Sequence, residues 1–143
     1  MSKMKVIFWS QSGNTEAMAN AVAEGIKEAG REAEAVFVTE VTPDSIKDDS
    51  SFALGCPAMG AEVLEENDME PFVECLEAIC NGKNIALFGS YGWGDGQWMR
   101  DWTDRLAAAG ANVLNGEGLI CQNAPDESVL NECRELGKQL AGL

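Results

Sequence analysis

The sequence has no histidine and little positive charge. Ten Lys and Arg residues stand against 24 Asp and Glu residues, which gives a formal net charge of -14. Because a surface this acidic repels phosphate backbones and anionic lipids, we expect neither nucleic acid nor a membrane as a partner. A basic protein surface is the expected partner instead.

Long apolar runs are also absent. The stretch from Val6 to Trp9 is far shorter than the core of a signal peptide or a membrane span. We therefore expect a cytoplasmic protein. A chain of 143 residues with 45% apolar residues can form one compact domain with a proper core, so residues 1–143 are expected to be a single domain.

Cysteines are few and odd in number. They lie at no metal-ligand spacing and have no histidine to complete a metal site. We expect buried thiols in a reducing compartment rather than redox groups or metal ligands. The five are Cys56, Cys75, Cys80, Cys121 and Cys133.

Short apolar runs that end in turn residues predict five strands. They cover Lys5–Trp9, Glu34–Val38, Ser51–Gly55, Asn84–Gly89 and the interrupted pair Val113–Leu114 with Leu119–Cys121. Between them, apolar residues at three-to-four spacing predict helices with stripes at 17–26, 69–79, 98–106 and 129–140. Thr42 and Pro43 resemble an N-cap and a first helical residue, which predicts a short further helix over 45–49.

Strands that alternate with helices and are apolar on both faces predict a parallel sheet covered on both sides. The expected fold class is α/β, a three-layer sandwich with a five-stranded parallel sheet of order 2-1-3-4-5 and helices on both faces. Ligands in such sheets bind beyond the carboxyl ends of the strands, where the winding direction reverses. The residues after the first, third and fourth strands are therefore the candidates for a site.

A polar loop, Ser10-Gln11-Ser12-Gly13-Asn14-Thr15, follows the first strand and leads into the first helix. Unpaired N–H groups and the helix dipole favour an anion there. The loop has no lysine or arginine, and it matches neither the triphosphate pattern G-x-x-x-x-G-K-[ST] nor the dinucleotide pattern G-x-G-x-x-G. It predicts a cradle for one phosphate monoester, although such clusters also cap helices without any ligand.

The loops after the third and fourth strands suit a flat ring. Met59, Gly60 and Glu62 offer a polarizable thioether, a glycine that tolerates positive φ and a carboxylate for a ring N–H. Trp93, between glycines, suits stacking on an aromatic ligand. The alternatives are a plain acidic connection and a Trp93 folded back onto the core. The other three tryptophans are predicted to lie in the core: Trp9, Trp98 and Trp102.

In the strand order 2-1-3-4-5 these three loops meet at one edge of the sheet. A phosphate cradle, a thioether with a carboxylate and an aromatic platform would then lie together. A ligand with a phosphate at one end, a planar ring at the other and an N–H to donate matches flavin mononucleotide (FMN).

These residues resemble the flavodoxins, in particular the short-chain type of anaerobic bacteria. The resemblance spans nearly the whole chain and is most specific at Met59-Gly60-x-Glu62, at 89–96 and at Trp98-Met99. It implies a flavodoxin-like fold and a low-potential one-electron carrier. Such a carrier holds FMN non-covalently, shuttles electrons between redox enzymes and uses the semiquinone/hydroquinone couple.

The resemblance also implies which residues hold FMN. Those around the phosphate would be Ser10, Ser12, Asn14, Thr15 and Ser90. Met59 and Trp93 would flank the ring, backbone N–H groups around Gly92 and Trp93 would meet its pyrimidine edge, Glu62 would accept N3–H, and the Gly60 carbonyl would turn toward N5. The whole predicted set is Ser10, Gln11, Ser12, Gly13, Asn14, Thr15, Pro57, Ala58, Met59, Gly60, Ala61, Glu62, Ser90, Tyr91, Gly92, Trp93, Gly94 and Asp95.

Three positions depart from the family pattern: Gln11, Ser12 and Ala61. Ser12 keeps a hydroxyl where threonine is usual, whereas the bulk of Gln11 would alter access for the phosphate. At Ala61 a type II turn needs a positive φ that alanine resists, while a type II' turn needs it at Gly60. We therefore expect Ala61 to favour the turn that points the Gly60 carbonyl at the flavin and stabilises the semiquinone.

Acidic residues border the predicted site. Glu62 and Asp95 would disfavour the anionic, fully reduced flavin and so lower its potential. The nearby acidic run is either a solvated helix start or a docking face for basic redox partners near the flavin edge. We expect a monomer. The run consists of Glu62, Glu65, Glu66, Asp68 and Glu70.

Two other functions fit this topology. An NAD(P)H-dependent flavin or quinone reductase would need room for nicotinamide over the flavin and basic residues for the second nucleotide, whereas Trp93 and acidic residues stand there. A phosphate-receiving signalling domain would need an aspartate after the third strand, where this chain has Cys56 and Pro57. An electron-transfer protein is therefore expected rather than an enzyme.

Overall fold

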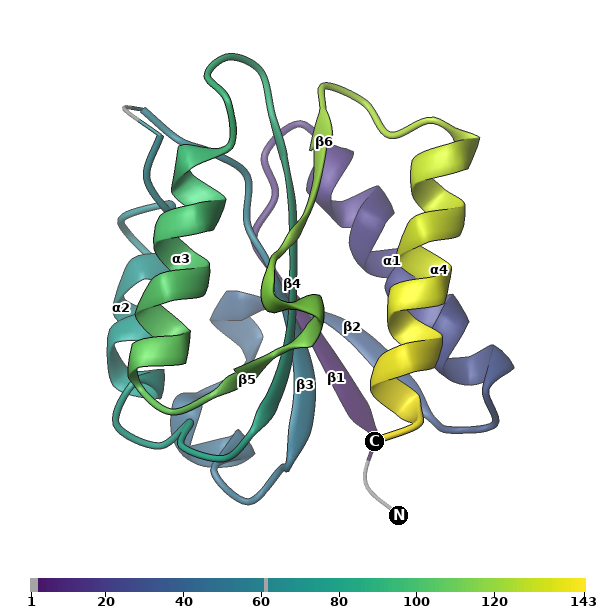
Figure 1. Cartoon of the computed structure of the whole chain (residues 1–143), viewed down its shortest axis with the longest axis vertical. Coiled ribbons are helices and arrows are strands. Elements are labelled where there is room, and N and C mark those ends of the chain that lie inside the picture. Colours follow the sequence, from purple (N-terminus) through teal and green to yellow (C-terminus); the bar gives the residue numbers. More distant parts are fainter. Residues whose placement is uncertain (1–2, 61) are drawn as a thin grey trace.

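A parallel sheet lies between two helical layers in the computed structural model, which describes residues 3–60 and 62–143 (Figure 1). The strand order is β2-β1-β3-β4-β5, and β6 also pairs with β4. The predicted α/β sandwich and its order 2-1-3-4-5 are confirmed. The strands are β1 (Met4–Phe8), β2 (Ala33–Phe37), β3 (Ser51–Gly55), β4 (Asn84–Tyr91), β5 (Asn112–Val113) and β6 (Leu119–Gln122).

In the described part of the chain, four α-helices cover the two faces of the sheet. They are α1 (Asn14–Glu28), α2 (Met69–Leu76), α3 (Gln97–Ala108) and α4 (Glu127–Ala141). Figure 1 shows α2 and α3 to the left of the sheet and α1 and α4 to the right. Side chains alternate along each strand, so Ile7 of β1 packs in the core under α2 and α3, whereas Val6 and Phe8 pack under α1 and α4.

The predicted fifth strand is divided into two short strands. β5 pairs with the start of β4, and β6 pairs with its end from Phe88 to Tyr91. A 3-10 turn, η3 (Leu114–Gly116), separates them. Asn115 and Gly116 there have φ values of 63° and 72°, in the left-handed region, where an extended strand cannot continue. The six-stranded sheet is thus the predicted five-stranded one with an interrupted edge.

The helix predicted over 45–49 is wrong in extent. A single 3-10 turn, η2 (Pro43–Ile46), forms instead, after the shorter turn η1 (Val38–Glu40). Thr42 is its N-cap as predicted, and its hydroxyl accepts a hydrogen bond from the Ser45 N–H at 3.2 Å. Only four residues separate Ile46 from the start of β3 at Ser51, so the turn has little room to propagate into an α-helix.

The tryptophans and cysteines lie mostly where they were expected. Trp98 and Trp102 are each 1% exposed, whereas Trp9 is only partly buried and packs against Phe37. All five cysteines are free thiols, and four are buried; Cys75 is exposed because it lies on the solvent side of α2, which corrects the prediction. Burial raises the pKa of the Cys56 and Cys133 thiols to about 12, so both stay protonated and unreactive at neutral pH.

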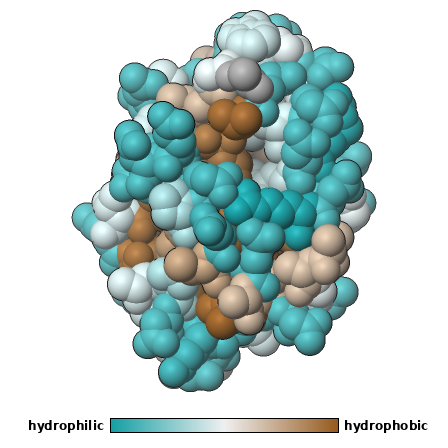
Figure 2. All heavy atoms as spheres, turned by 90° about the vertical axis from the view of Figure 1, so that its left-hand side faces the viewer, coloured by the Kyte–Doolittle hydropathy of each residue, from teal (hydrophilic) through white to brown (hydrophobic). Residues whose placement is uncertain are grey.

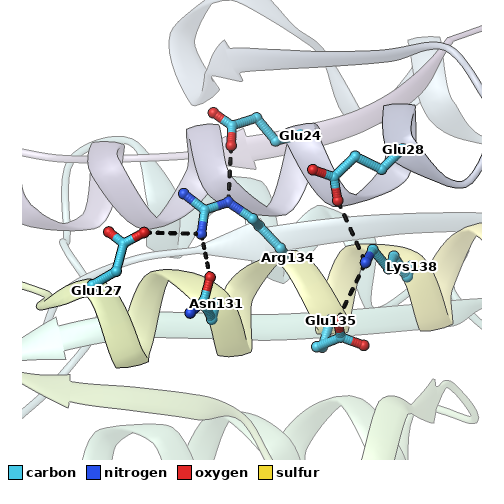
Figure 3. Close-up of polar contacts among 7 residues, drawn as sticks. All are labelled: Glu24, Glu28, Glu127, Asn131, Arg134, Glu135 and Lys138. Carbon is cyan, nitrogen blue, oxygen red and sulfur yellow. Dashed lines mark hydrogen bonds and ion pairs between the residues drawn. The ribbon is translucent and has the colours of Figure 1, made fainter.

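Helices α1 and α4 pack with their backbones in close contact. A Cβ at Gly25 would collide with the carbonyl of Arg134, and one at Gly137 would collide with the carbonyl of Val22. Figure 3 shows that Arg134 and Lys138 of α4 reach Glu24 and Glu28 of α1 across the same seam. Two glycines thus set how closely these helices approach.

Within residues 3–60 and 62–143, no helix combines the length and apolar character needed to span a membrane.

Candidate functional site

The loop after β1 forms an open cradle at the start of α1. Gly13 is the N-cap residue and has a φ of 94°. As a glycine, it has no side chain with which to cap the helix. The hydroxyl oxygen of Ser10 accepts hydrogen bonds from the N–H groups of Gly13 and Glu16, at 3.2 and 3.3 Å. This bends the loop back over the first turn and leaves a helix N-terminus surrounded by neutral polar side chains, which suits an anion.

Thr15 and Ser90 connect this cradle to β4. Both side chains are buried, and their hydroxyl oxygens lie 3.4 Å apart. Thr15 sits in the first turn of α1, and Ser90 is next to last in β4. The two hydroxyls therefore come from elements 75 residues apart in the sequence and meet at the carboxyl edge of the sheet.

The loop after β3 first continues the pairing with β4 and then folds into a tight turn. The Ala58 N–H donates to the Ser90 carbonyl at 3.1 Å. Met59 and Val63 then exchange two backbone hydrogen bonds, at 2.8 and 2.9 Å. Gly60 has φ of 49° and Glu62 has φ of 55°, so the chain enters the left-handed region on both sides of the turn's centre, at Gly60 without steric cost. The part of the turn hypothesis that concerns Ala61 lies outside the described residues.

The loop after β4 presents Trp93 to solvent. Its side chain is 65% exposed, so the interpretation of a lid folded onto the core is wrong, and the prediction of a surface indole is confirmed. Gly94 and Gly96 have φ values of 90° and 93°, which explains the need for glycine at both positions. Asp95 is paired with Arg100 at 3.0 Å, so its charge is partly offset.

Glu62 ties this loop to the turn after β3. Its Oε1 atom accepts hydrogen bonds from the N–H groups of Asp95 and Gly96, at 3.2 and 3.3 Å, just before α3 begins. A Cβ at Gly94 would collide with the same carboxylate. Oε1 thus holds the two loops together, and Oε2 accepts neither of these two hydrogen bonds.

These loops enclose a cavity of about 300 Å³ at the carboxyl edge of the sheet. Eleven predicted residues line it: Ser10, Gln11, Ser12, Asn14, Thr15, Pro57, Ala58, Met59, Ser90, Tyr91 and Gly92. The other described members of the set lie in the same loops but outside this lining: Gly13, Gly60, Glu62, Trp93, Gly94 and Asp95. The structure thus brings the three loops together, and the roles of individual residues stay predictions.

Asn123 also lines the cavity, and the sequence did not lead us to it. Its N–H donates to the Tyr91 carbonyl at 2.8 Å, and its φ of 61° turns the chain toward the site directly after β6. The adjacent Gln122 side chain donates to the Gly92 carbonyl at 3.5 Å. The available signal was a pair of polar amides at the end of the last strand, which shares the carboxyl edge with the other loops.

Two members of the acidic run have structural partners. Glu65 is only 5% exposed, and its carboxylate accepts N–H groups of Asn67, Asp68 and Met69 at 2.8 to 2.9 Å. It therefore caps α2 from three residues upstream, which corrects its place in a solvated or docking surface. Glu70 pairs with Arg105, which also pairs with Glu77.

Comparisons with known proteins agree with this geometry. The flavodoxin family profile matches residues 6–137. The flavodoxin of Clostridium beijerinckii is 46% identical over 140 residues, covering 98% of this chain and 100% of that protein. The flavodoxin of Megasphaera elsdenii is 41% identical over 138 residues, covering 96% and 98%.

The solved structures extend the match to three dimensions. The solution structure of two-electron reduced Megasphaera elsdenii flavodoxin matches with a TM-score of 0.86 at 40% identity, covering 98% of this chain and 99% of that one. Flavodoxins bind FMN and transfer electrons to redox partners. This chain therefore belongs to the flavodoxin family, of the short-chain anaerobic bacterial type, and is an FMN-binding electron carrier rather than an enzyme.

Proposed function

We propose that FMN lies along the carboxyl edge of the sheet, with its phosphate at the start of α1 and its ring between Met59 and Trp93. The observation that carries this proposal is the cavity of about 300 Å³ that the loops after β1, β3 and β4 line together. In this arrangement Ser10, Ser12, Asn14, Thr15 and Ser90 hold the phosphate, and Asn123 joins the predicted set at its rim.

The residues present fit that ligand. The phosphate end offers a helix N-terminus with a glycine N-cap and hydroxyl groups, which bind a monoester without a fixed positive charge. The ring end offers a thioether and an indole that is 65% exposed, an unusual exposure for so large an apolar side chain. Oε2 of Glu62 is the oxygen we assign to the ring N–H, because Oε1 already accepts two backbone donors.

Bound FMN supplies the one-electron redox chemistry, and the protein sets which oxidation state is bound best. We propose that the lower of its two one-electron couples is the one in use. Glu62 stands at the ring end and the chain carries a net charge of -14, so an added electron meets negative charge. Asp95 contributes less than the sequence suggested, because Arg100 lies 3.0 Å from its carboxylate.

Replacing Glu62 by glutamine tests this electrostatic account. The amide keeps an oxygen for the Asp95 and Gly96 N–H groups, so the loops stay joined, while the negative charge disappears and an NH2 group replaces Oε2 as the neighbour of the ring N–H. The potential of the lower couple should rise by roughly 30 to 60 mV, of the order expected for one partly screened charge near the ring. A redox titration of the loaded protein, wild type against variant, measures the shift.

Glu66→Gln is the matched control for this titration. Glu66 is exposed and belongs to the same acidic run, but among the described residues the hydrogen bonds to the Asp95 and Gly96 N–H groups come from Glu62 and not from Glu66. The control removes the same charge from a residue that is not assigned to the ring. It should therefore move the potential much less than Glu62→Gln. Equal shifts in the two variants, or no rise in the Glu62 variant, would contradict the assignment of Glu62.

We also propose that the partners are basic redox proteins that dock near the flavin edge, and that the protein is a cytoplasmic monomer with one domain over 1–143. Val63 and Trp93, 52% and 65% exposed, belong to the two loops that flank the proposed ring site, and Glu66, three residues after Val63, is also exposed. Electrostatic attraction between the acidic surface and a basic partner speeds their encounter, and this attraction weakens as salt is added. The face over α2 and α3 is mostly hydrophilic, with small separate apolar areas, which favours a monomer (Figure 2).

A further inference from the structure

A buried hydrogen bond joins the bases of the two loops that flank the proposed ring site. The indole Nε1 of Trp98, a residue that is 1% exposed, donates to the carbonyl oxygen of Cys56 at 3.1 Å. Cys56 is the first residue of the loop after β3, and Trp98 lies in the first turn of α3, directly after the loop that carries Trp93. The bond therefore links the Met59 side of the site to the Trp93 side from below.

The neighbouring residues leave room for this bond and hold its acceptor in place. The Trp98 ring packs against Tyr91, which lines the cavity, with ring centroids 5.5 Å apart. A Cβ at Gly89 would collide with the Cys56 carbonyl oxygen and would lie 3.2 Å from Cζ2 of Trp98, so glycine makes the room that the bond needs. The Cys56 N–H donates to the Phe88 carbonyl at 3.1 Å, which holds the same residue through its other backbone group.

We propose that Trp98 is a positioning residue of the flavin site. Its indole N–H fixes the Cys56 carbonyl and so holds the turn that carries Met59 at a set separation from the loop that carries Trp93. Trp98 lines no part of the cavity itself, and it acts through these two loops. It can do so only if FMN lies between them, so this role rests on the site proposed above.

Trp102 offers a natural comparison on the same helix. It lies one turn later in α3 and is also 1% exposed. Its Nε1 atom is buried and, within the described part of the chain, has no hydrogen-bond partner. Replacement by phenylalanine therefore removes a similar volume and an N–H at both positions, but it breaks a bond to the flavin loops only at Trp98.

The test compares Trp98→Phe with Trp102→Phe. FMN is titrated into each apoprotein, with flavin fluorescence as the signal, and the two one-electron potentials of the loaded proteins are measured. Trp98→Phe should weaken FMN binding about threefold to tenfold, the range expected for one buried hydrogen bond, and should change the separation of the two potentials. Trp102→Phe should leave FMN affinity within about twofold of wild type, because no bond to either loop is lost.

Unchanged affinity and potentials in a folded Trp98→Phe protein would overturn the proposal, as would equal losses in both variants, which would indicate a general effect of core volume. If Trp98→Phe does not fold, site-specific replacement of Trp98 by benzothienylalanine removes the N–H but keeps the bicyclic shape, and the same expectations apply. Wild-type protein that binds no FMN would overturn the proposed site itself, an outcome distinct from a failure confined to Trp98.

Discussion

Replacing Gly25 by alanine should lower the free energy of unfolding by about 3 kcal/mol, at the upper end of the effects of overpacking a close contact. The new Cβ would collide with the backbone carbonyl of Arg134, and a backbone cannot rotate away as a side chain can. Helices α1 and α4 would have to move apart. That movement would loosen the packing of Val22 and Ile26, which are completely buried on the same face of α1.

Gly142→Ala is the control for this prediction. Gly142 lies at the end of α4 with φ of -81°, and an added Cβ would make only ordinary contacts, at 3.6 Å or more. Alanine there should change stability by less than about 0.5 kcal/mol, because it introduces no strain. Urea unfolding of the two variants and wild type measures the differences. A Gly25→Ala protein as stable as wild type would show that the α1–α4 contact is not tight.

Replacing Glu65 by alanine should cost about 2 to 3 kcal/mol of folding stability, because a buried carboxylate that caps several N–H groups is lost. Three donors at the start of α2 lose their acceptor at once, and the Met69 N–H lies in a buried environment that water reaches poorly. The start of α2 supports the turn after β3, since the Glu65 N–H also bonds Cys56 Sγ at 3.4 Å. We therefore expect weaker FMN binding as a secondary effect.

The neighbouring Glu66 provides the comparison. It is exposed, so Glu66→Ala should change the free energy of unfolding by less than about 0.5 kcal/mol. Urea unfolding of the two variants, each free of FMN, separates a cap from a surface charge. Equal, small effects in both would mean that Glu65 is as dispensable as its neighbour and that α2 is capped in another way.

The contrast between these two glutamates shows what the sequence could and could not predict. In the sequence both belong to one acidic run, and nothing in that run distinguishes a buried cap from a solvated charge. The distinction depends on how the chain folds back between the turn at Met59 and the start of α2. A cap three residues ahead of the usual N-cap position has no sequence pattern of its own.

The sheet and the three loops were predictable because they follow from periodicity and from the topology of doubly wound sheets. Asn123 was not predicted, because the expected site comprised only the loops after the first, third and fourth strands, while the end of β6 reaches the same edge. Trp98 was assigned to the core correctly, but a helical stripe cannot reveal that its N–H bonds Cys56. Specific polar contacts between distant elements depend on tertiary structure.

The phosphate cradle at the start of α1 is proposed to supply most of the affinity for FMN. Titration of the flavin-free protein with FMN and, in parallel, with riboflavin, which has the same ring but no phosphate, tests this role. We expect one FMN per chain, with its fluorescence quenched beside Trp93. We also expect riboflavin to bind at least about 100-fold more weakly, since several charge-assisted hydrogen bonds are lost. Equal affinity for the two flavins, or no binding of either, would contradict the account.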